Sequence, residues 1–209
     1  MGRKLRAIYL GGVRVDCALV DAESLSQDQS MNDLAALNVP LAMARFPGSA
    51  PEGWIPMVRG YAKPRPAPHE ALEPLDAQHH PMMRGLYGLF AGRFTGMLTR
   101  EDPEEWEARL EAPVNNLGVF EGERLLLCLA EKDGELLELS AAPDALSRIP
   151  GALSAAGITR APAPLLGVPA ETTDETVKLK LLRPFHLPDG RIETPEQLAR
   201  ALDGAVQWD

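Results

Sequence analysis

The sequence is poor in cysteine, in aromatic residues and in positive charge, and each shortage narrows what the chain can be. Two cysteines in 209 residues, Cys17 and Cys128, are too few for a disulfide framework, so we expect free thiols in a reducing compartment. Aromatic residues make up 5% of the chain, so aliphatic side chains must form most of the core. The net charge of −9 argues against a general nucleic-acid binder and no local basic patch stands out, so we expect nucleic acid as a partner only within a larger complex.

Long apolar runs are also missing. The longest apolar region, from Met82 to Leu98, is interrupted by Arg84 and Arg93 and does not predict a helix that crosses a membrane. The apolar run from Ala7 to Leu10 is too short for the core of a secretion signal. These two observations predict a cytoplasmic protein without a membrane partner.

Familiar catalytic and cofactor motifs are absent from the sequence. There is no GxSxG element, neither cysteine is near a histidine along the chain, and the glycines lack dinucleotide-binding or P-loop spacing. His79 and His80 are the candidates for a metal site, but adjacent side chains diverge and zinc needs three or four converging ligands. We therefore predict neither a cofactor nor a bound metal.

Two β-hairpins are the clearest local signals that the sequence does contain. Residues 7–20 place β-favouring runs on both sides of Gly11-Gly12, a two-residue loop suited to positive φ angles. Residues 124–130 and 135–140 flank Lys132-Asp133-Gly134 in the same manner. A further strand, Val177 to Leu181, alternates apolar and lysine residues, which predicts one face in water.

Helix start and stop signals accompany these strands. Asp102-Pro103 predicts a helix that ends near Glu111, and Thr194 to Gln197 forms a capping box that opens another short helix. A helix is also expected from Pro143 to Ala156, with Pro150 as a kink, and one more from Ser30 to Leu37. Hairpins with interspersed helices predict an α+β fold: a mostly antiparallel sheet built from hairpins, with short helices packed on it.

A proline-rich stretch suggests how the chain is divided. Lys63 to Pro68 alternates proline with other residues, which favours an extended polyproline II path. This stretch is interpreted as a linker or surface loop over residues 63–81, or alternatively as a ligand for a proline-binding domain. The predicted division is an N-terminal hairpin and helix lobe over 1–62 and an α+β lobe over 82–209, or one continuous domain.

Glycine is concentrated at positions 85, 88, 92 and 96. As a helix, this segment would present a stripe of small residues to another helix, whereas as a bent strand it would let backbone approach a ligand. Four glycines disfavour a helix, so both alternatives stay open. The candidate binding residues of this segment are Arg84, Tyr87, Gly88, Gly92, Arg93 and Gly96.

Two functional hypotheses follow. The first is a non-enzymatic accessory or interaction protein, such as an inhibitor, an immunity-type binder, an adaptor or a small subunit of a complex, with another protein as its partner. It depends on the missing catalytic motifs and the acidic composition. The alternative is a small enzyme whose active site is assembled from non-contiguous residues around the glycine-rich segment 85–96.

Overall fold

A computed structural model describes residues 5–23, 34 and 36–206 of the chain. The chain forms two compact units, each assembled from several stretches of sequence. Unit 1 comprises residues 1–59, 92–99 and 173–207, and unit 2 comprises residues 60–91, 100–172 and 208–209. The division into lobes that the sequence suggests, with a linker over residues 63–81, stays a prediction.

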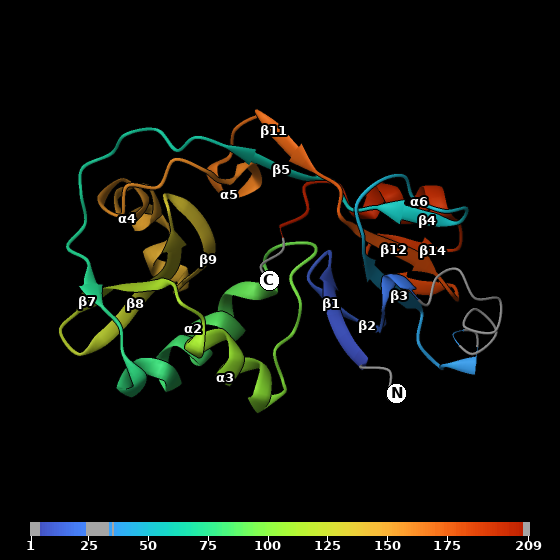
Figure 1. Ribbon diagram of the computed structural model, residues 1–209, viewed down its shortest axis with the longest axis horizontal. Helices are drawn as coiled ribbons and strands as arrows, with labels where there is room; N and C mark the ends of the chain where they lie inside the picture. The colour runs from blue at the N-terminus through green and yellow to red at the C-terminus, as the bar shows by residue number, and fades with distance from the viewer. Residues whose placement is uncertain (1–4, 24–33, 35, 207–209) are drawn as a thin grey trace. The chain divides into compact units, whose positions relative to one another are not determined.

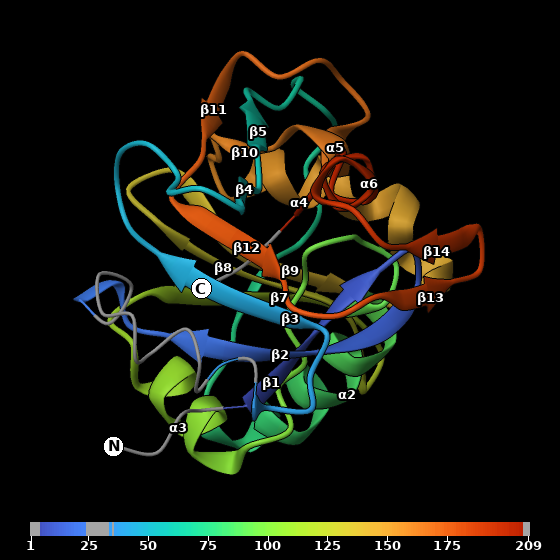
Figure 2. The same cartoon turned by 90° about the vertical axis from the view of Figure 1, so that its right-hand side faces the viewer.

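Unit 1 is built on a five-stranded sheet in the order β1-β2-β3-β12-β4, which Figure 2 shows from below upward. All neighbours in this sheet are antiparallel except β2 and β3, which are parallel. Apolar side chains of the sheet pack together with Leu198 of α6 (Pro195–Ala201). The strands are β1 (Leu5–Leu10), β2 (Val13–Val20), β3 (Leu41–Arg45), β12 (Val177–Leu181) and β4 (Trp54–Pro56).

The two hairpins predicted from glycine-containing turns are confirmed. Gly11 and Gly12 join β1 to β2 with φ angles of 55° and 78°. In unit 2, Asp133 and Gly134 join β8 (Arg124–Lys132) to β9 (Glu135–Ala141) with φ angles of 54° and 79°. Positive φ at both turn residues matches the twist of antiparallel strands. The short turn sequences were therefore sufficient to predict both hairpins.

Strand β12 is where the predicted strand 177–181 lies, but its expected wet face is wrong. Lys178 is only 1% exposed. Its ammonium group donates to the carbonyls of Phe46 at 2.7 Å and Glu175 at 2.8 Å, and lies 4.2 Å from the centre of the Phe46 ring. These contacts satisfy the buried charge, which alternation along the strand alone could not reveal. A second short hairpin of unit 1 pairs β13 (Phe185–Leu187) with β14 (Gly190–Ile192).

Unit 2 contains an antiparallel sheet in the order β6-β7-β8-β9, with helices on both faces (Figure 1). Here β6 is Glu73–Pro74 and β7 is Asn115–Glu121. Met83 and Leu86 of α2 (His80–Ala91) pack on Leu126 and Cys128 of β8. The remaining helices of unit 2 are η2 (Ala77–His79), α3 (Pro103–Glu111), η3 (Pro143–Arg148), α4 (Ile149–Ala155) and α5 (Ala163–Leu166).

The capping signals predicted in the sequence are confirmed in detail. The Asp102 side chain accepts from the Glu104 amide, and Thr194 forms a capping box with Gln197. The segment from Pro143 to Ala156 is two helices rather than one, because η3 ends before Pro150 takes its place in the first turn of α4. Most of the helix expected from Ser30 to Leu37 lies outside the described residues.

The proline-rich stretch lies along α4. The Ala67 amide donates to the Ser154 hydroxyl at 3.3 Å, and the Glu70 amide donates to the Gly151 carbonyl at 3.3 Å. A side chain at Gly151 would place its Cβ 2.5 Å from the Pro68 carbonyl oxygen, so glycine is required for this close approach. A three-stranded sheet accompanies this stretch, in the order β10 (Ala161–Pro162), β5 (Arg59–Ala62) and β11 (Thr172–Asp174).

The glycine-rich segment is part helix and part irregular chain. Helix α2 includes Gly85 and Gly88 but ends at Ala91, so the four glycines do not form one helical stripe. Neither Gly85 nor Gly88 has an atom within 4 Å of the place its Cβ would occupy. Packing therefore does not require glycine at either position.

The α+β class predicted from hairpins and short helices is confirmed. Within the described ranges, no helix combines the length and the apolar composition that a membrane crossing demands.

Gly88→Ala and Gly151→Ala should change the free energy of unfolding in opposite directions. Alanine at position 88 should stabilise the protein by about 1 kcal/mol, because it favours the helix and meets open space. Alanine at position 151 should destabilise it by about 1–3 kcal/mol, because its Cβ would collide with the Pro68 carbonyl. Urea unfolding measures both changes. A destabilised Gly88→Ala variant would contradict the exposed environment of this glycine.

Candidate functional site

The most unusual feature of unit 2 is a pair of parallel segments that touch once and then separate. The Leu136 amide at the beginning of β9 donates to the Arg160 carbonyl at 3.0 Å, and Glu135 and Arg160 form a single parallel bridge. Directly after Arg160, β10 pairs with β5 instead of continuing along β9. The Thr159 and Arg160 amides also donate to the Gly134 carbonyl, but beyond Leu136 and Arg160 no backbone hydrogen bond joins the two segments in the described chain.

Strand β9 consequently has one side without a strand partner. The Ala142 amide donates to the Leu126 carbonyl at 2.8 Å, toward β8. Because backbone groups alternate in direction along an antiparallel strand, the N–H and C=O groups of Leu139 and Ala141 point away from β8. We call these groups the outer edge of β9. No backbone hydrogen bond joins them to another residue of the described chain.

An irregularity in strand pairing precedes the outer edge. Ala130 pairs with Glu138 and Glu131 pairs with Leu136, so β9 holds one extra residue, Leu137, between them. A bulge of this kind bends a strand and changes the direction of its backbone groups. Leu139 and Ala141 are both fully buried, so the outer edge lies in surroundings where a hydrogen bond is stronger than in water.

One face of β9 carries a buried group of charges. Glu138 is 3% exposed and forms ion pairs with Arg100 and with Arg109, whose Nε donates to Oε2 at 3.1 Å. The two arginine side chains are 6% and 9% exposed. Arg109 also donates to the Asn116 side chain at 3.0 Å, while its Nη1 has no hydrogen-bond partner.

Aromatic rings cover the Arg100 guanidinium. Its central carbon lies 4.4 Å from the Tyr87 ring centre and 5.1 Å from that of Trp106. These two rings meet edge to face at 5.4 Å, and the Trp106 indole donates to the Arg100 carbonyl at 3.0 Å. The side chain of Arg84 lies 5.8 Å from the Trp106 ring centre. This arrangement encloses the charges of Glu138 and its partners and holds β9 against α3.

Cys128 and Ser140 lie opposite each other on β8 and β9, beside this charge group. Burial, followed by the charge of Glu138, raises the pKa of the Cys128 thiol to about 12. A thiol with this pKa is not ionised near neutral pH and is not a nucleophile. The Ser140 hydroxyl is buried and lacks a hydrogen-bond partner. Among the described residues, no histidine or carboxylate is hydrogen-bonded to either side chain in the manner that activates a nucleophile.

The candidate residues predicted from the sequence fall into both units. Arg84 and Tyr87 belong to unit 2 and lie close to Trp106, and the exposed Gly88 follows on the same helix. Whether any of the candidates binds a ligand stays a prediction. In unit 1, Gly92 would place a Cβ 3.5 Å from the Tyr9 ring, Arg93 is exposed, and Gly96 has a φ of 94°.

Of the two candidate metal-binding histidines, His79 and His80, the first caps a helix. His79 Nδ1 accepts from the Asp76 amide at 3.1 Å in a capping box at the beginning of η2, and the His79 ring lies 5.5 Å from that of Phe120. No group of three or more His, Cys, Asp or Glu side chains in the described part of the chain is arranged to hold a metal ion.

Sequence reasoning missed Glu138. A signal was present, because this carboxylate lies in an apolar strand between Leu137 and Leu139. Asp16, between Val15 and Cys17 of β2, instead faces water, with its side chain 53% exposed.

Replacing Glu138 should be far more harmful than replacing an exposed carboxylate. Glu138→Gln leaves Arg100 and Arg109 buried beside a neutral group, and we expect a loss of about 3–5 kcal/mol in unfolding free energy. Asp144→Asn is the matched control, because Asp144 pairs with Arg124 in an exposed position, and it should change stability much less. Equal losses in urea unfolding would mean that the Glu138 charge group does not stabilise the fold.

Comparisons with known proteins identify the fold. No protein-family model matches the chain, and no curated protein matches its sequence. A GCN5-related N-acetyltransferase from Anabaena variabilis aligns with a TM-score of 0.58 and 13% identity, over 87% of this chain and 60% of that one. A probable N-acyltransferase from Enterococcus faecalis aligns with a TM-score of 0.57 and 14% identity, over 86% of this chain and 58% of that one. N-myristoyltransferase from Saccharomyces cerevisiae, described with bound myristoyl-CoA, aligns with a TM-score of 0.51 and 10% identity, over 98% of this chain and 72% of that one.

These likenesses overturn the prediction of a non-enzymatic interaction protein or complex subunit, and they favour the alternative of a small enzyme. That prediction depended on the absence of catalytic motifs. Such an absence argues only against active sites that are made of characteristic side chains. The chain spans less than two thirds of the length of the two bacterial proteins. The chain has the fold of the GCN5-related N-acetyltransferases.

Proposed function

We propose that the chain transfers an acyl group from a thioester to an amine, with the donor bound along the outer edge of β9. One observation carries this proposal: the outer edge of β9 offers backbone N–H and C=O groups, at Leu139 and Ala141, that no described strand occupies. The shared fold with proteins described as N-acetyltransferases or N-acyltransferases supports the same reaction class.

The chemistry of a thioester donor suits this edge. The pantetheine arm of an acyl-CoA is an extended chain with two amide groups, and it can hydrogen-bond to a strand edge as another strand would. Peptide recognition by strand addition follows the same principle, since backbone groups supply the affinity. Leu139 and Ala141 are fully buried, so a donor must displace the atoms that cover this edge before its hydrogen bonds form out of water.

The reaction needs no cofactor beyond the donor itself. The amine nitrogen attacks the thioester carbonyl carbon, a C–N bond forms, and the C–S bond then breaks. The amine loses a proton and the leaving sulfur gains one, so the products are an amide and a free thiol. An N–H group directed at the thioester oxygen would stabilise the charge that develops there in the transition state.

Glu138 is not the group that receives the proton in this scheme. Its carboxylate is 4% exposed and is occupied by Arg100 and by the Arg109 Nε. Its function is to position β9: the ion pairs fix the strand just before the outer edge begins. We place the reaction in the cytoplasm, where the free cysteines Cys17 and Cys128 would stay reduced.

Donor binding tests this proposal without knowledge of the amine. The thioether analogue acetonyl-pantetheine cannot transfer its acyl group, and calorimetry should detect its binding to the 209-residue chain at millimolar concentrations or below. Ala141→Pro removes one outward N–H and should abolish binding, because this amide does not pair with β8.

Ala141→Gly is the matched control, because it retains the amide and should retain binding. Circular dichroism verifies that both variants are folded. If Ala141→Pro does not fold, competition between acetonyl-pantetheine and acetyl-pantetheine in the unaltered chain decides the question. No binding of either compound would overturn the proposed function.

A further inference from the structure

The two ends of the outer edge of β9 differ in how the neighbouring segments are joined. At the beginning of β9, the Leu136 amide donates to the Arg160 carbonyl and joins the two parallel segments, so no donor can pair with β9 there. The other end reaches the turn from β9 into η3, at residues 142–145. A donor arm bound along the edge must therefore place everything attached to it at this turn.

In coenzyme A, a diphosphate links the pantetheine arm to a phosphorylated adenosine. Proteins hold such groups with free backbone N–H donors, with glycines that allow close approach, and with the positive end of a helix.

The turn has no free backbone donors. The Ala142 amide donates to the Leu126 carbonyl, and the Ala145 amide donates to the Ala142 carbonyl at 2.9 Å. Pro143 has no N–H, and the Asp144 amide interacts with its own carboxylate. All four positions are therefore unable to donate to a phosphate oxygen.

Charge at the turn is also unfavourable for a phosphate. Hydrogen bonds from Arg124, and then from its own backbone, lower the pKa of Asp144, so its carboxylate is ionised at neutral pH. Arg124 is bound to Asp144 through two hydrogen bonds of 2.9 Å, and Arg148 pairs with Glu70 at 3.0 Å. The cations on both sides of the turn are thus already neutralised.

No glycine near the turn allows a phosphate to approach the backbone closely. The nearest glycine further along the chain is Gly151, and the space beside it is filled by the Pro68 carbonyl. This glycine is used for contact between α4 and the proline-rich stretch, and a ligand has no access to its backbone from that side.

We infer that the chain recognises its donor through the thioester arm alone, and that Asp144 and Pro143 determine this specificity by rejecting a diphosphate. The expected donor class is an acyl-pantetheine thioester without a nucleotide. This inference rests on the proposed function, and it adds which part of the donor is bound.

The direct test compares acetyl-pantetheine with acetyl-CoA. Competition calorimetry against acetonyl-pantetheine should give acetyl-CoA no more than about a threefold advantage, because its diphosphate finds no donor at the turn. An advantage of about tenfold or more for acetyl-CoA would overturn the inference while leaving the proposed function intact. If neither compound binds, the proposed function itself fails, so the two failures are distinguishable.

A variant with a rebuilt turn provides the converse test. Pro143→Gly combined with Asp144→Gly restores an N–H group and removes the carboxylate, which also releases Arg124 for a phosphate. Binding of acetyl-CoA should then improve by about tenfold or more relative to acetyl-pantetheine. An unchanged ratio in the folded variant would exclude this turn as the determinant.

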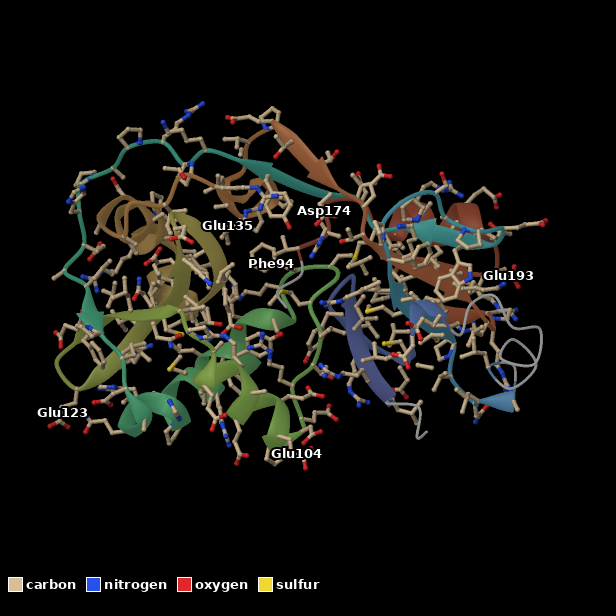
Figure 3. The ribbon with its side chains drawn as sticks, viewed as in Figure 1. Phe94, Glu104, Glu123, Glu135, Asp174 and Glu193 are labelled. Atoms are coloured by element: carbon tan, nitrogen blue, oxygen red, sulfur yellow. The ribbon has the colours of Figure 1, made fainter. Side chains whose placement is uncertain are left out.

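Glu104→Gln is the control for the change in net charge. Glu104 is exposed at the beginning of α3 (Figure 3), and its replacement removes one negative charge from unit 2 away from the turn. Asp144→Asn should raise the preference for acetyl-CoA whereas Glu104→Gln should not. Equal effects of both variants would assign the preference to overall charge and would overturn the role of Asp144.

Discussion

A single backbone hydrogen bond, from Leu136 to the Arg160 carbonyl, determines the arrangement on which the proposed site depends. It is supported on both sides: the Thr159 amide donates to the Gly134 carbonyl at 2.8 Å, and Arg160 pairs with Glu135. The Arg160 guanidinium also lies 3.6 Å from the centre of the Tyr61 ring. Beyond this point β10 pairs with β5, so β9 has no strand partner on the side opposite β8. The outer edge thus exists because Arg160 is fixed to the beginning of β9, whereas β10, which follows Arg160, pairs with β5.

Local signals in the sequence were sufficient for elements whose conformation depends on adjacent residues. The turns at Gly11-Gly12 and Asp133-Gly134 and the caps at Asp102 and Thr194 each depend on backbone angles or on a side chain two or three residues away. Lys178 shows the limit of such reasoning. Its burial depends on the Phe46 carbonyl and ring, 132 residues away along the chain, and no local pattern encodes that contact.

The candidate site was missed for a different reason. Outward N–H and C=O groups of β9 are backbone atoms, and every residue type except proline carries both. Their availability depends on which strand lies beside them, a property of topology rather than of residue type. An argument from missing motifs could therefore exclude a serine or cysteine nucleophile, but it could not exclude an acyltransferase. The hypothesis of a non-enzymatic protein extended that argument beyond the side chains to which it applies, whereas the alternative of a small enzyme did not depend on it.

In the proposed site, backbone and side chains would divide the recognition of the donor between them. The hydrogen-bonding groups of the outer edge do not depend on side-chain type, because Leu139 and Ala141 would offer the same N–H and C=O groups after any substitution except proline. The turn that follows is sensitive, because Pro143 removes an N–H and Asp144 adds a negative charge. A fold can therefore keep the site for a thioester arm through extensive sequence change, while a few substitutions at the turn decide which carriers of that arm are accepted. Under the proposed function, a chain 13% identical to a GCN5-related N-acetyltransferase could share its fold and still accept a different donor.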